Sequence, residues 1–310
     1  MRLRDRAALL LLGAIWGSSF LFMKVAEPEF GAVPLIALRV SIGAVLLTGL
    51  LAARGDLGAL RGRTGAFLRI GALNSAVPFT LYAWATGSLG AGLPSVLNAT
   101  VPLFGALVGF VWLREGLSAA RAACLAVGFA GVLVLTWPKL AAAGADTSAL
   151  GVAAGLFAAL LYAVAAHDSK RAFAGVPPLA VAAGSMLGAS ALLVPPALFL
   201  LPVELPGPRA LCAAIALCVV CTSLAYALYF RLLVALGATR AITVTYLVPC
   251  FGLLWGWLFL AEPLTLRTLA GSVVVLTGTA LVLRAGAARP VPQPVSPAES
   301  CPNSPPRTAR

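Results

Sequence analysis

Ten long runs of apolar residues make up most of the 310-residue chain, and each is about as long as a helix that crosses a bilayer. The hydrocarbon core of a bilayer is about 30 Å thick, so about 20 apolar residues in an α-helix span it. Because 61% of the residues are hydrophobic and only 10% are charged, a water-soluble fold could not hide this much apolar surface. The sequence therefore predicts an all-α integral membrane protein. The predicted spans are 7–26, 32–53, 67–88, 90–113, 119–137, 149–166, 178–201, 210–230, 241–260 and 266–283.

Basic residues are unevenly distributed between the two sides of such a ten-span protein. If the N-terminus is cytoplasmic, 17 Lys and Arg residues fall on the cytoplasmic side and 3 fall outside, with Lys24 and Arg39 left within or beside helices. Cytoplasmic loops retain Lys and Arg, so this bias favours ten spans with both termini in the cytoplasm. These loops explain the net charge of +12 without nucleic acid. Residues 285–310 are rich in Pro, Ser and Arg and predict a disordered cytoplasmic tail.

The second half of the chain repeats the first. Residues 81–117 align without a gap on residues 228–264, at a shift of 147, and 14 of 37 positions are identical. The composition alone would give about 4. Each half holds five predicted spans, and an odd number forces the second copy to enter the bilayer from the opposite side. We therefore expect two inverted repeats, 7–137 and 148–284, a construction of secondary transporters that bind substrate near the bilayer midplane.

Two prolines at equivalent positions predict breaks in the fourth and ninth spans. Pro102 and Pro249 lack a backbone donor, which frees the carbonyl four residues earlier, that of Asn98 or Thr245. Both of these residues are polar, so the paired breaks could hold a small polar solute at mid-depth. The other interpretation is a kink whose carbonyls are satisfied by neighbouring hydroxyl groups or water.

Polar and aromatic side chains gather on a subset of the spans, and lipid-facing positions rarely need such groups. They predict the lining of a water-filled path for a small-molecule substrate. For Tyr82 and Tyr229, anchoring at the membrane interface is an equal alternative. With Asn98 and Thr245, the predicted substrate-binding residues are Trp16, Ser19, Asn74, Tyr82, Tyr162, Tyr226, Tyr229 and Tyr246.

Four charged residues within or at the ends of spans are candidates for ion coupling. Arg39 lies deep in the second span, where an unpaired guanidinium is costly, so it needs a partner or a cavity. Lys24 lies near the outer end of the first span, where snorkelling to the headgroups explains it better. Glu115 and Glu262 end the fourth and ninth spans at equivalent positions, and a structural link between helices is favoured over proton carriage.

The motifs that would indicate an enzyme are absent from the sequence. None of the three lysines follows a glycine, so no phosphate-binding G-K-[ST] loop makes ATP the direct energy source. A single histidine excludes H-E-x-x-H, and no G-x-S-x-G occurs. We therefore expect no catalytic residue, no metal and no cofactor.

The order of several motifs resembles the EamA type of the drug/metabolite transporter superfamily, from about residue 7 to residue 283. This resemblance implies ten helices in two inverted five-helix EamA repeats around a central cavity. It also implies a bacterial inner-membrane carrier, often an exporter of amino acids or related metabolites. The second repeat departs from the pattern where Tyr162 stands in place of Trp16. The motifs are Ala14-Ile15-Trp16-Gly17-Ser18-Ser19-Phe20, Ala37-Leu38-Arg39, the stretch 97–102 leading to Glu115, and Leu247-Val248-Pro249 leading to Glu262-Pro263-Leu264.

Together these features lead us to expect a secondary carrier that exports amino acids or similar small polar metabolites by alternating access. Proton exchange or the solute gradient would drive it. The alternatives are uptake, a carrier of a different substrate class, and a non-transporting membrane scaffold or receptor. The expected partners are a small-molecule substrate and membrane lipid, without nucleic acid, and a homodimer is compatible with the sequence.

Overall fold

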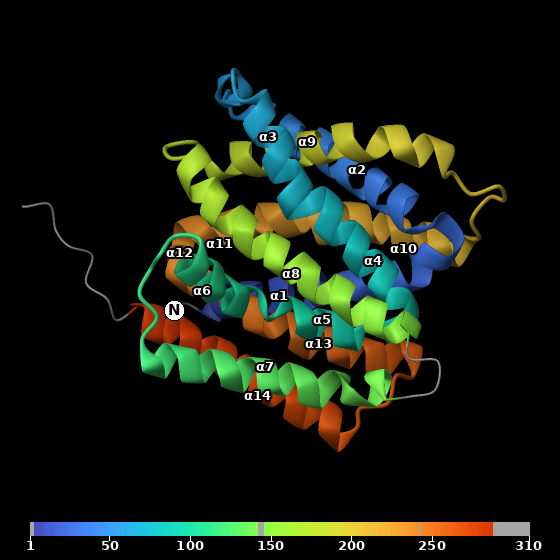
Figure 1. The fold of residues 1–310 in the computed structure, drawn as a ribbon. Coiled ribbons are helices and arrows are strands. Elements are labelled where there is room, and N and C mark those ends of the chain that lie inside the picture. Colours follow the sequence, from blue (N-terminus) through green and yellow to red (C-terminus); the bar gives the residue numbers. More distant parts are fainter. Residues whose placement is uncertain (1–2, 142–145, 242, 288–310) are drawn as a thin grey trace, which may run out of the picture.

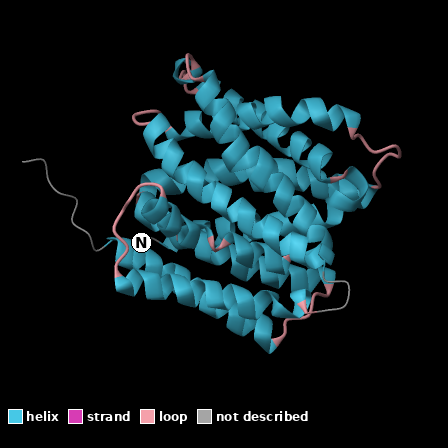
Figure 2. Ribbon diagram, in the orientation of Figure 1, coloured by secondary structure: helices cyan, strands magenta, loops and turns pink. Residues whose placement is uncertain are grey.

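The computed structural model describes residues 3–141, 146–241 and 243–287, and in them every regular element is helical (Figure 2). The helices form one bundle whose connections gather at its two ends (Figure 1). We call the end at which α1 begins, on the left in Figure 1, the proximal end, and the opposite end the distal end.

The first half of the chain supplies the elements α1 to α7. In order they are α1 (Leu3–Phe30), α2 (Ala32–Ala53), the 3₁₀ turn η1 (Leu57–Leu60), α3 (Thr64–Gly71), the π turn η2 (Ala72–Ala76), α4 (Val77–Leu89), α5 (Gly92–Asn98), α6 (Val101–Val111) and α7 (Ala119–Leu140). The second half supplies α8 (Asp146–Ala172), α9 (Pro178–Phe199), α10 (Pro208–Cys218), the π turn η3 (Val219–Leu224), α11 (Ala225–Leu236), α12 (Ala238–Ala241), α13 (Val244–Leu260) and α14 (Leu266–Ala287).

Eight helices of the described chain are long and apolar enough to cross a membrane, and α13 is a shorter apolar helix. Two of the eight are composite, because α5 and α6 together form one and α10, η3 and α11 form another. The predicted span 67–88 corresponds to α3, η2 and α4, which follow one another without a gap. The count of ten spans stays a prediction. Of the predicted tail, residues 285–287 belong to α14, and 288–310 lie outside the described residues.

The first helices of the two halves run in opposite directions. Lys24, late in α1, donates to the carbonyl of Gly87 in the last turns of α4 (2.8 Å), and Gly151, early in α8, packs against the same turns. At the other end of α8, Asp168 pairs with Arg69 near the start of α3 (2.7 Å). Because α1 ends where α8 begins, α8 enters the bundle from the distal end.

Backbone irregularities recur at the 147-residue shift of the sequence repeat. Arg114 and Ala261, which follow equivalent helices, are the non-glycine residues with positive φ in the described chain, at 55° and 53°. The next residues, Glu115 and Glu262, each donate a backbone N–H to the carbonyl six residues earlier (3.0 and 3.1 Å). The two connections therefore turn in the same way, as expected of duplicated halves.

The π turns also occupy equivalent positions. η2 joins α3 to α4, and η3 joins α10 to α11. No apolar pattern predicts such a turn, since it lengthens a helix by one residue without ending it. π turns are frequent at functional sites. Here they bring Ser75 and Thr222 into the bundle, where both side chains are fully buried.

The chain is interrupted near Pro102. α5 ends at Asn98, and Pro102 lies in the first turn of α6, where its missing N–H is no loss. The hydroxyl of Thr279 in α14 donates to the carbonyl of Ala99 at the interruption (3.0 Å, buried). A neighbouring hydroxyl therefore satisfies the carbonyl of Ala99, which is the residue after Asn98, whose carbonyl the sequence predicts to be freed.

The structure shows no break at Pro249, contrary to the expectation from the sequence. α13 begins at Val244 and continues through this proline. A proline inside a membrane helix is tolerated where its surroundings supply the lost backbone partners. Pro102 therefore lies in the first turn of its helix, whereas Pro249 lies inside α13.

Candidate functional site

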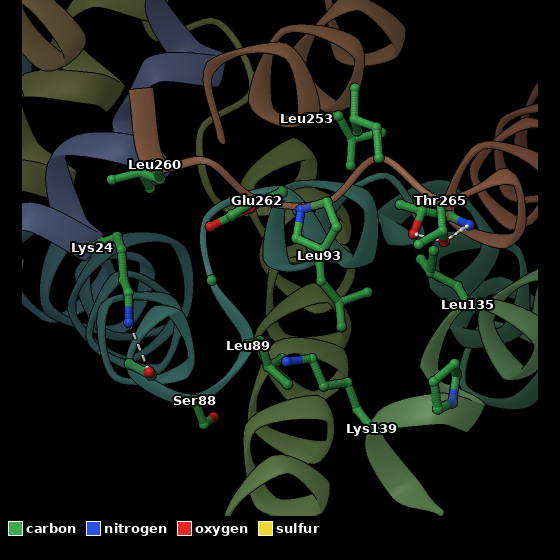
Figure 3. Close-up of a pocket in the computed structure, with 17 residues that line it drawn as sticks. Lys24, Ser88, Leu89, Leu93, Leu135, Lys139, Leu253, Leu260, Glu262 and Thr265 are labelled. Carbon is green, nitrogen blue, oxygen red and sulfur yellow. Dashed lines mark hydrogen bonds between the residues drawn. The ribbon is translucent and has the colours of Figure 1, made fainter. Parts of the chain in front are cut away.

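Two cavities of similar size lie toward opposite ends of the bundle. The distal cavity has a volume of about 550 Å³ and lies between the ends of α4, α7 and α13 and the starts of α5 and α14 (Figure 3). The proximal cavity has a volume of about 510 Å³ and lies between α1, η2, α8, α9 and α11. They differ in what their polar groups do.

Two of the charged groups of the distal cavity, Lys24 and Glu262, hold helices together. Lys24 donates to the carbonyl of Gly87, which Figure 3 shows as a dashed line. The carboxylate of Glu262, between α13 and α14, accepts hydrogen bonds from the backbone N–H groups of Ala91 (2.6 Å) and Gly92 (3.0 Å) at the start of α5. The first N–H groups of a helix lack partners within it, and a negative charge is favourable there. Glu262 therefore ties α13 to α5.

Glycines make room for this carboxylate. A Cβ atom at Gly90 or Gly256 would collide with the side chain of Glu262. Gly90 also has a φ of 82°, which turns the chain from α4 into α5 and which other residues rarely adopt. The link therefore depends on the sequence around it as well as on the glutamate.

The proximal cavity is lined by aromatic and polar groups that the sequence singled out. Trp16 of α1 lies 5.4 Å from Tyr229 and 6.2 Å from Tyr226, measured between ring centroids. Asn74 in η2 lies in the same lining. The structure thus brings together four of the predicted substrate-binding residues. The sequence analysis missed other polar members of the lining, which are Ser169, Lys170 and Ser185.

Close helix packing directs Trp16 toward this cavity. A Cβ atom at Gly17, the next residue, would lie 2.7 Å from Phe251 and 2.9 Å from Gly252 in α13. Successive residues of a helix point about 100° apart. Gly17 therefore packs against α13 while Trp16, the residue before it, lies on a neighbouring face of α1 and meets α11 at the cavity.

Further predicted residues form a deeper cluster. Tyr82 and Tyr162 are stacked at 6.1 Å between ring centroids, and Tyr82 also meets Phe20 at 5.6 Å. Arg39 is only 5% exposed and donates from Nε to the hydroxyl of Thr222 (3.0 Å). None of these residues lines either cavity.

The remaining predicted residues are scattered. Asn98 ends α5, while Thr245 and Tyr246 lie in the first turn of α13, and all three are half-buried outside both cavities. Ser19 is buried in α1. Glu115 is exposed, and within the described part of the chain its carboxylate makes no hydrogen bond or ion pair.

Comparison with known proteins places the chain among transporters. The model of the EamA-like transporter family matches residues 7–137 and 149–284. The Bacillus subtilis protein named uncharacterized transporter YvbV is 25% identical over 284 residues, covering 90% of this chain and 92% of that protein. A Streptantibioticus cattleyicolor protein named "Probable terminal-alkyne amino-acid exporter" is 27% identical over 289 residues, covering 89% and 92%.

A solved structure supports the fold. A protein crystal structure matches 93% of this chain and 100% of its own chain, with a TM-score of 0.61 and 21% sequence identity. At this identity the match speaks for the fold alone. Because the family model covers most of both halves and many helices are long enough to span a bilayer, this chain is a multi-pass membrane protein that belongs to the EamA-like transporter family.

Proposed function

We propose that this chain is a secondary carrier that exports amino acids or similar small polar metabolites by alternating access, with the proximal cavity as its substrate site. The observation that carries the proposal is the difference between the two ends of the bundle. A cavity with polar and aromatic groups lies at the proximal end, while Glu262 ties two helices together at the distal end.

The proximal cavity suits a small polar solute. Its volume of about 510 Å³ falls within the usual range for small-molecule sites. Trp16, Tyr226 and Tyr229 offer ring faces and polar ring edges, and Asn74 offers both a donor and an acceptor. Such a lining suits a solute that has a small apolar part and several polar atoms, and amino acids have both.

Alternating access requires a second state in which the distal end opens and the proximal end closes. Glu115 has the same sequence context and backbone turn as Glu262, and the start of α12 is equivalent to the start of α5. In the opposite state we expect Glu115 to cap α12 as Glu262 caps α5 here. The carrier would then exchange one carboxylate cap for the other in each cycle.

The charge of the connections indicates the side to which the proximal cavity opens. Within the described residues, the Lys and Arg predicted to be cytoplasmic belong to the proximal end, so the proximal cavity would face the cytoplasm. The protein would lie in a bacterial inner membrane with ten spans and both termini cytoplasmic. The name of the Streptantibioticus cattleyicolor relative agrees with amino-acid export.

Proteoliposomes of defined orientation test this function. The purified protein is reconstituted, and the flux of a panel of radiolabelled amino acids is followed in both directions. We expect at least one amino acid to cross faster than in empty liposomes, with the Trp16→Ala variant at least about tenfold slower. Tyr246→Phe is the matched control, because Tyr246 is an aromatic residue outside the cavity. A flux that Trp16→Ala leaves unchanged would contradict the assignment of the cavity.

A further inference from the structure

The turn between α4 and α5 separates a carbonyl from an N–H group that a continuous helix would join. In such a helix the N–H of Ala91 would donate to the carbonyl of Gly87, four residues earlier. Gly90 turns the chain between them with a φ of 82°. The N–H of Ala91 instead donates to Glu262 (2.6 Å), and the carbonyl of Gly87 accepts a hydrogen bond from Nζ of Lys24 (2.8 Å). Each freed backbone group is therefore taken by a charged side chain.

The signs of the two charges suit the two helix ends. Carbonyl groups at the end of a helix carry partial negative charge, and N–H groups at its start carry partial positive charge. Lys24 meets the last turns of α4, and Glu262 meets the start of α5. Both side chains line the distal cavity, and they come from α1 and from the connection between α13 and α14 (Figure 3). Three separate parts of the chain are therefore tied together at the distal end.

The second half contains the same set of positions around its own helix turn. Gly237, between α11 and α12, has a φ of 78° and donates its N–H to the carbonyl of Leu233 (3.0 Å). Gly90 makes the equivalent hydrogen bond to Thr86 (3.1 Å). The two turns therefore have the same backbone geometry. At shifts of 146 or 147 residues, the equivalents are Lys170 for Lys24, Val234 for Gly87, Gly237 for Gly90 and Glu115 for Glu262.

The lysine of the proximal end is not bonded. Lys170, late in α8, is exposed, and within the described residues its amine makes no hydrogen bond or ion pair. Lys170 and Leu233, the residue before Val234, both line the proximal cavity. The last turns of α8 and α11 therefore border the same open space without a link from this lysine, whereas Lys24 joins the equivalent parts of α1 and α4.

We propose that Lys24 and Lys170 are alternating clamps, each of which bonds a carbonyl at the end of a helix when its own end of the bundle is closed. In the state described here, Lys24 holds the distal end through Gly87. In the opposite state, Lys170 donates to the carbonyl of Val234 and holds the proximal end. This inference deepens the proposed carrier function and rests on it, because it names residues that position the helices in each state. Exchanging one clamp for the other keeps the two states close in free energy, so neither state traps the cycle.

Hydrogen exchange at the distal turn measures how often the distal end opens. The bonded backbone amides of residues 90–92 exchange when their hydrogen bonds open, so their rate reports the population of the open state. The full chain is placed in lipid nanodiscs without added solute, and mass spectrometry follows the exchange. In Lys24→Gln we expect these amides to exchange about tenfold faster than in the wild type, because a hydrogen bond from a charged group is lost. An unchanged rate would contradict the distal clamp.

The decisive variant lies at the other end of the bundle. In Lys170→Gln the opposite state loses its clamp and is populated less, so the distal amides should exchange at least about threefold more slowly than in the wild type. A lysine with only a local structural role at the proximal end has no means of slowing exchange at the distal end. Lys170→Arg should restore the wild-type rate, because a guanidinium also donates hydrogen bonds to a carbonyl. A rate in Lys170→Gln that is unchanged or faster would overturn the proposal.

The third lysine of the chain supplies the matched control. Lys139, at the end of α7, also lines the distal cavity, but in the part of the chain that the structure describes it makes no hydrogen bond or ion pair. Lys139→Gln removes the same charge from the same cavity and should leave the exchange rate of the distal amides unchanged. If it accelerates exchange as much as Lys24→Gln does, the charge of the cavity and not the hydrogen bond to Gly87 holds the distal end, and the proposal fails.

Flux measurements distinguish a failure of this inference from a failure of the carrier function. If the wild-type protein carries a solute in proteoliposomes but Lys170→Gln does not slow distal exchange, the carrier stands and the alternating clamps are wrong. If exchange responds as expected but no solute of the panel crosses, the clamps and the two states stand and the assigned transport falls.

Discussion

Glu262 and Glu115 hold equivalent positions in the two halves, but their surroundings are opposite. Each follows a residue with positive φ and makes the same backbone hydrogen bond. Glu262 accepts two backbone hydrogen bonds at the distal end, whereas Glu115 is exposed at the proximal end. Since residue type and local backbone agree, the difference lies in what each carboxylate meets. Glu262 meets the start of α5, whereas the carboxylate of Glu115 meets no hydrogen-bond partner within the described residues.

Loss of the distal carboxylate should have the largest effect on stability. Glu262→Ala removes the hydrogen bonds to Ala91 and Gly92 and leaves two N–H groups of α5 without an acceptor. We expect the free energy of unfolding to fall by about 2 kcal/mol. Denaturant unfolding of the reconstituted protein measures this. Glu115→Ala is the matched variant and should change stability by less than about 0.5 kcal/mol. Similar losses of stability in both variants would contradict the difference between the two glutamates.

Substitutions of the glycines that contact the two glutamates should also affect stability unequally. In Gly256→Ala the new Cβ collides with the pinned carboxylate of Glu262, and we expect a loss of about 1 kcal/mol. In Gly109→Ala the Cβ would lie 2.8 Å from the carboxylate of Glu115, which is exposed and can move away. This variant should be as stable as the wild type or more stable by about 0.5 kcal/mol, because alanine favours a helix. The reverse order would show that Glu115 is the constrained partner.

Transport should reveal a role of Glu115 that stability does not. If Glu115 caps α12 in the opposite state, Glu115→Ala disfavours that state and slows the cycle by roughly threefold, equivalent to about 0.7 kcal/mol. The flux of the best amino acid in proteoliposomes measures the effect. A wild-type flux in Glu115→Ala would mean that the proximal end closes without this carboxylate.

The smallest effect is expected at the ion pair between Arg69 and Asp168. The two groups lie on the proximal surface, and Arg69 donates from Nε (2.7 Å) and Nη2 (3.0 Å). Water and salt screen such pairs, so Arg69→Gln should be the mildest of these variants and should differ least from the wild type at high salt. A loss of stability comparable to that of Glu262→Ala would show that side-chain contacts hold the helices together at the proximal end as well.

The sequence was sufficient for the helical architecture, because apolar runs of span length leave a chain little choice. It also pointed to Trp16, Asn74, Tyr226 and Tyr229, which the structure brings together, since polar groups in a span need an interior. The sequence could not distinguish these four residues from Asn98, Thr245 or Tyr246, because whether a side chain reaches a cavity depends on how the helices pack. Burial and polarity alone do not decide which interior position meets a cavity.

Local helix geometry was the hardest feature to predict. A proline indicates a weakened hydrogen-bond ladder, but whether the chain separates there depends on the neighbours, and α13 continues through Pro249 while the chain is interrupted near Pro102. The π turns leave no sign in the apolar pattern. The partner of Arg39 was also out of reach, because Thr222 is 183 positions away along the chain and meets it only after folding.

The two π turns have one consequence for how these helices can vary. An α-helix advances about 100° per residue, but a π turn is wider and absorbs one extra residue, so the helix that follows it keeps its phase. Tyr226 and Tyr229 follow η3, and Tyr82 follows η2. Deleting a single residue from Val219–Leu224 would therefore give a regular α-helix that still presents both tyrosines of α11 to the cavity. The same deletion in α10 would rotate both tyrosines by about 100° relative to the residues before it.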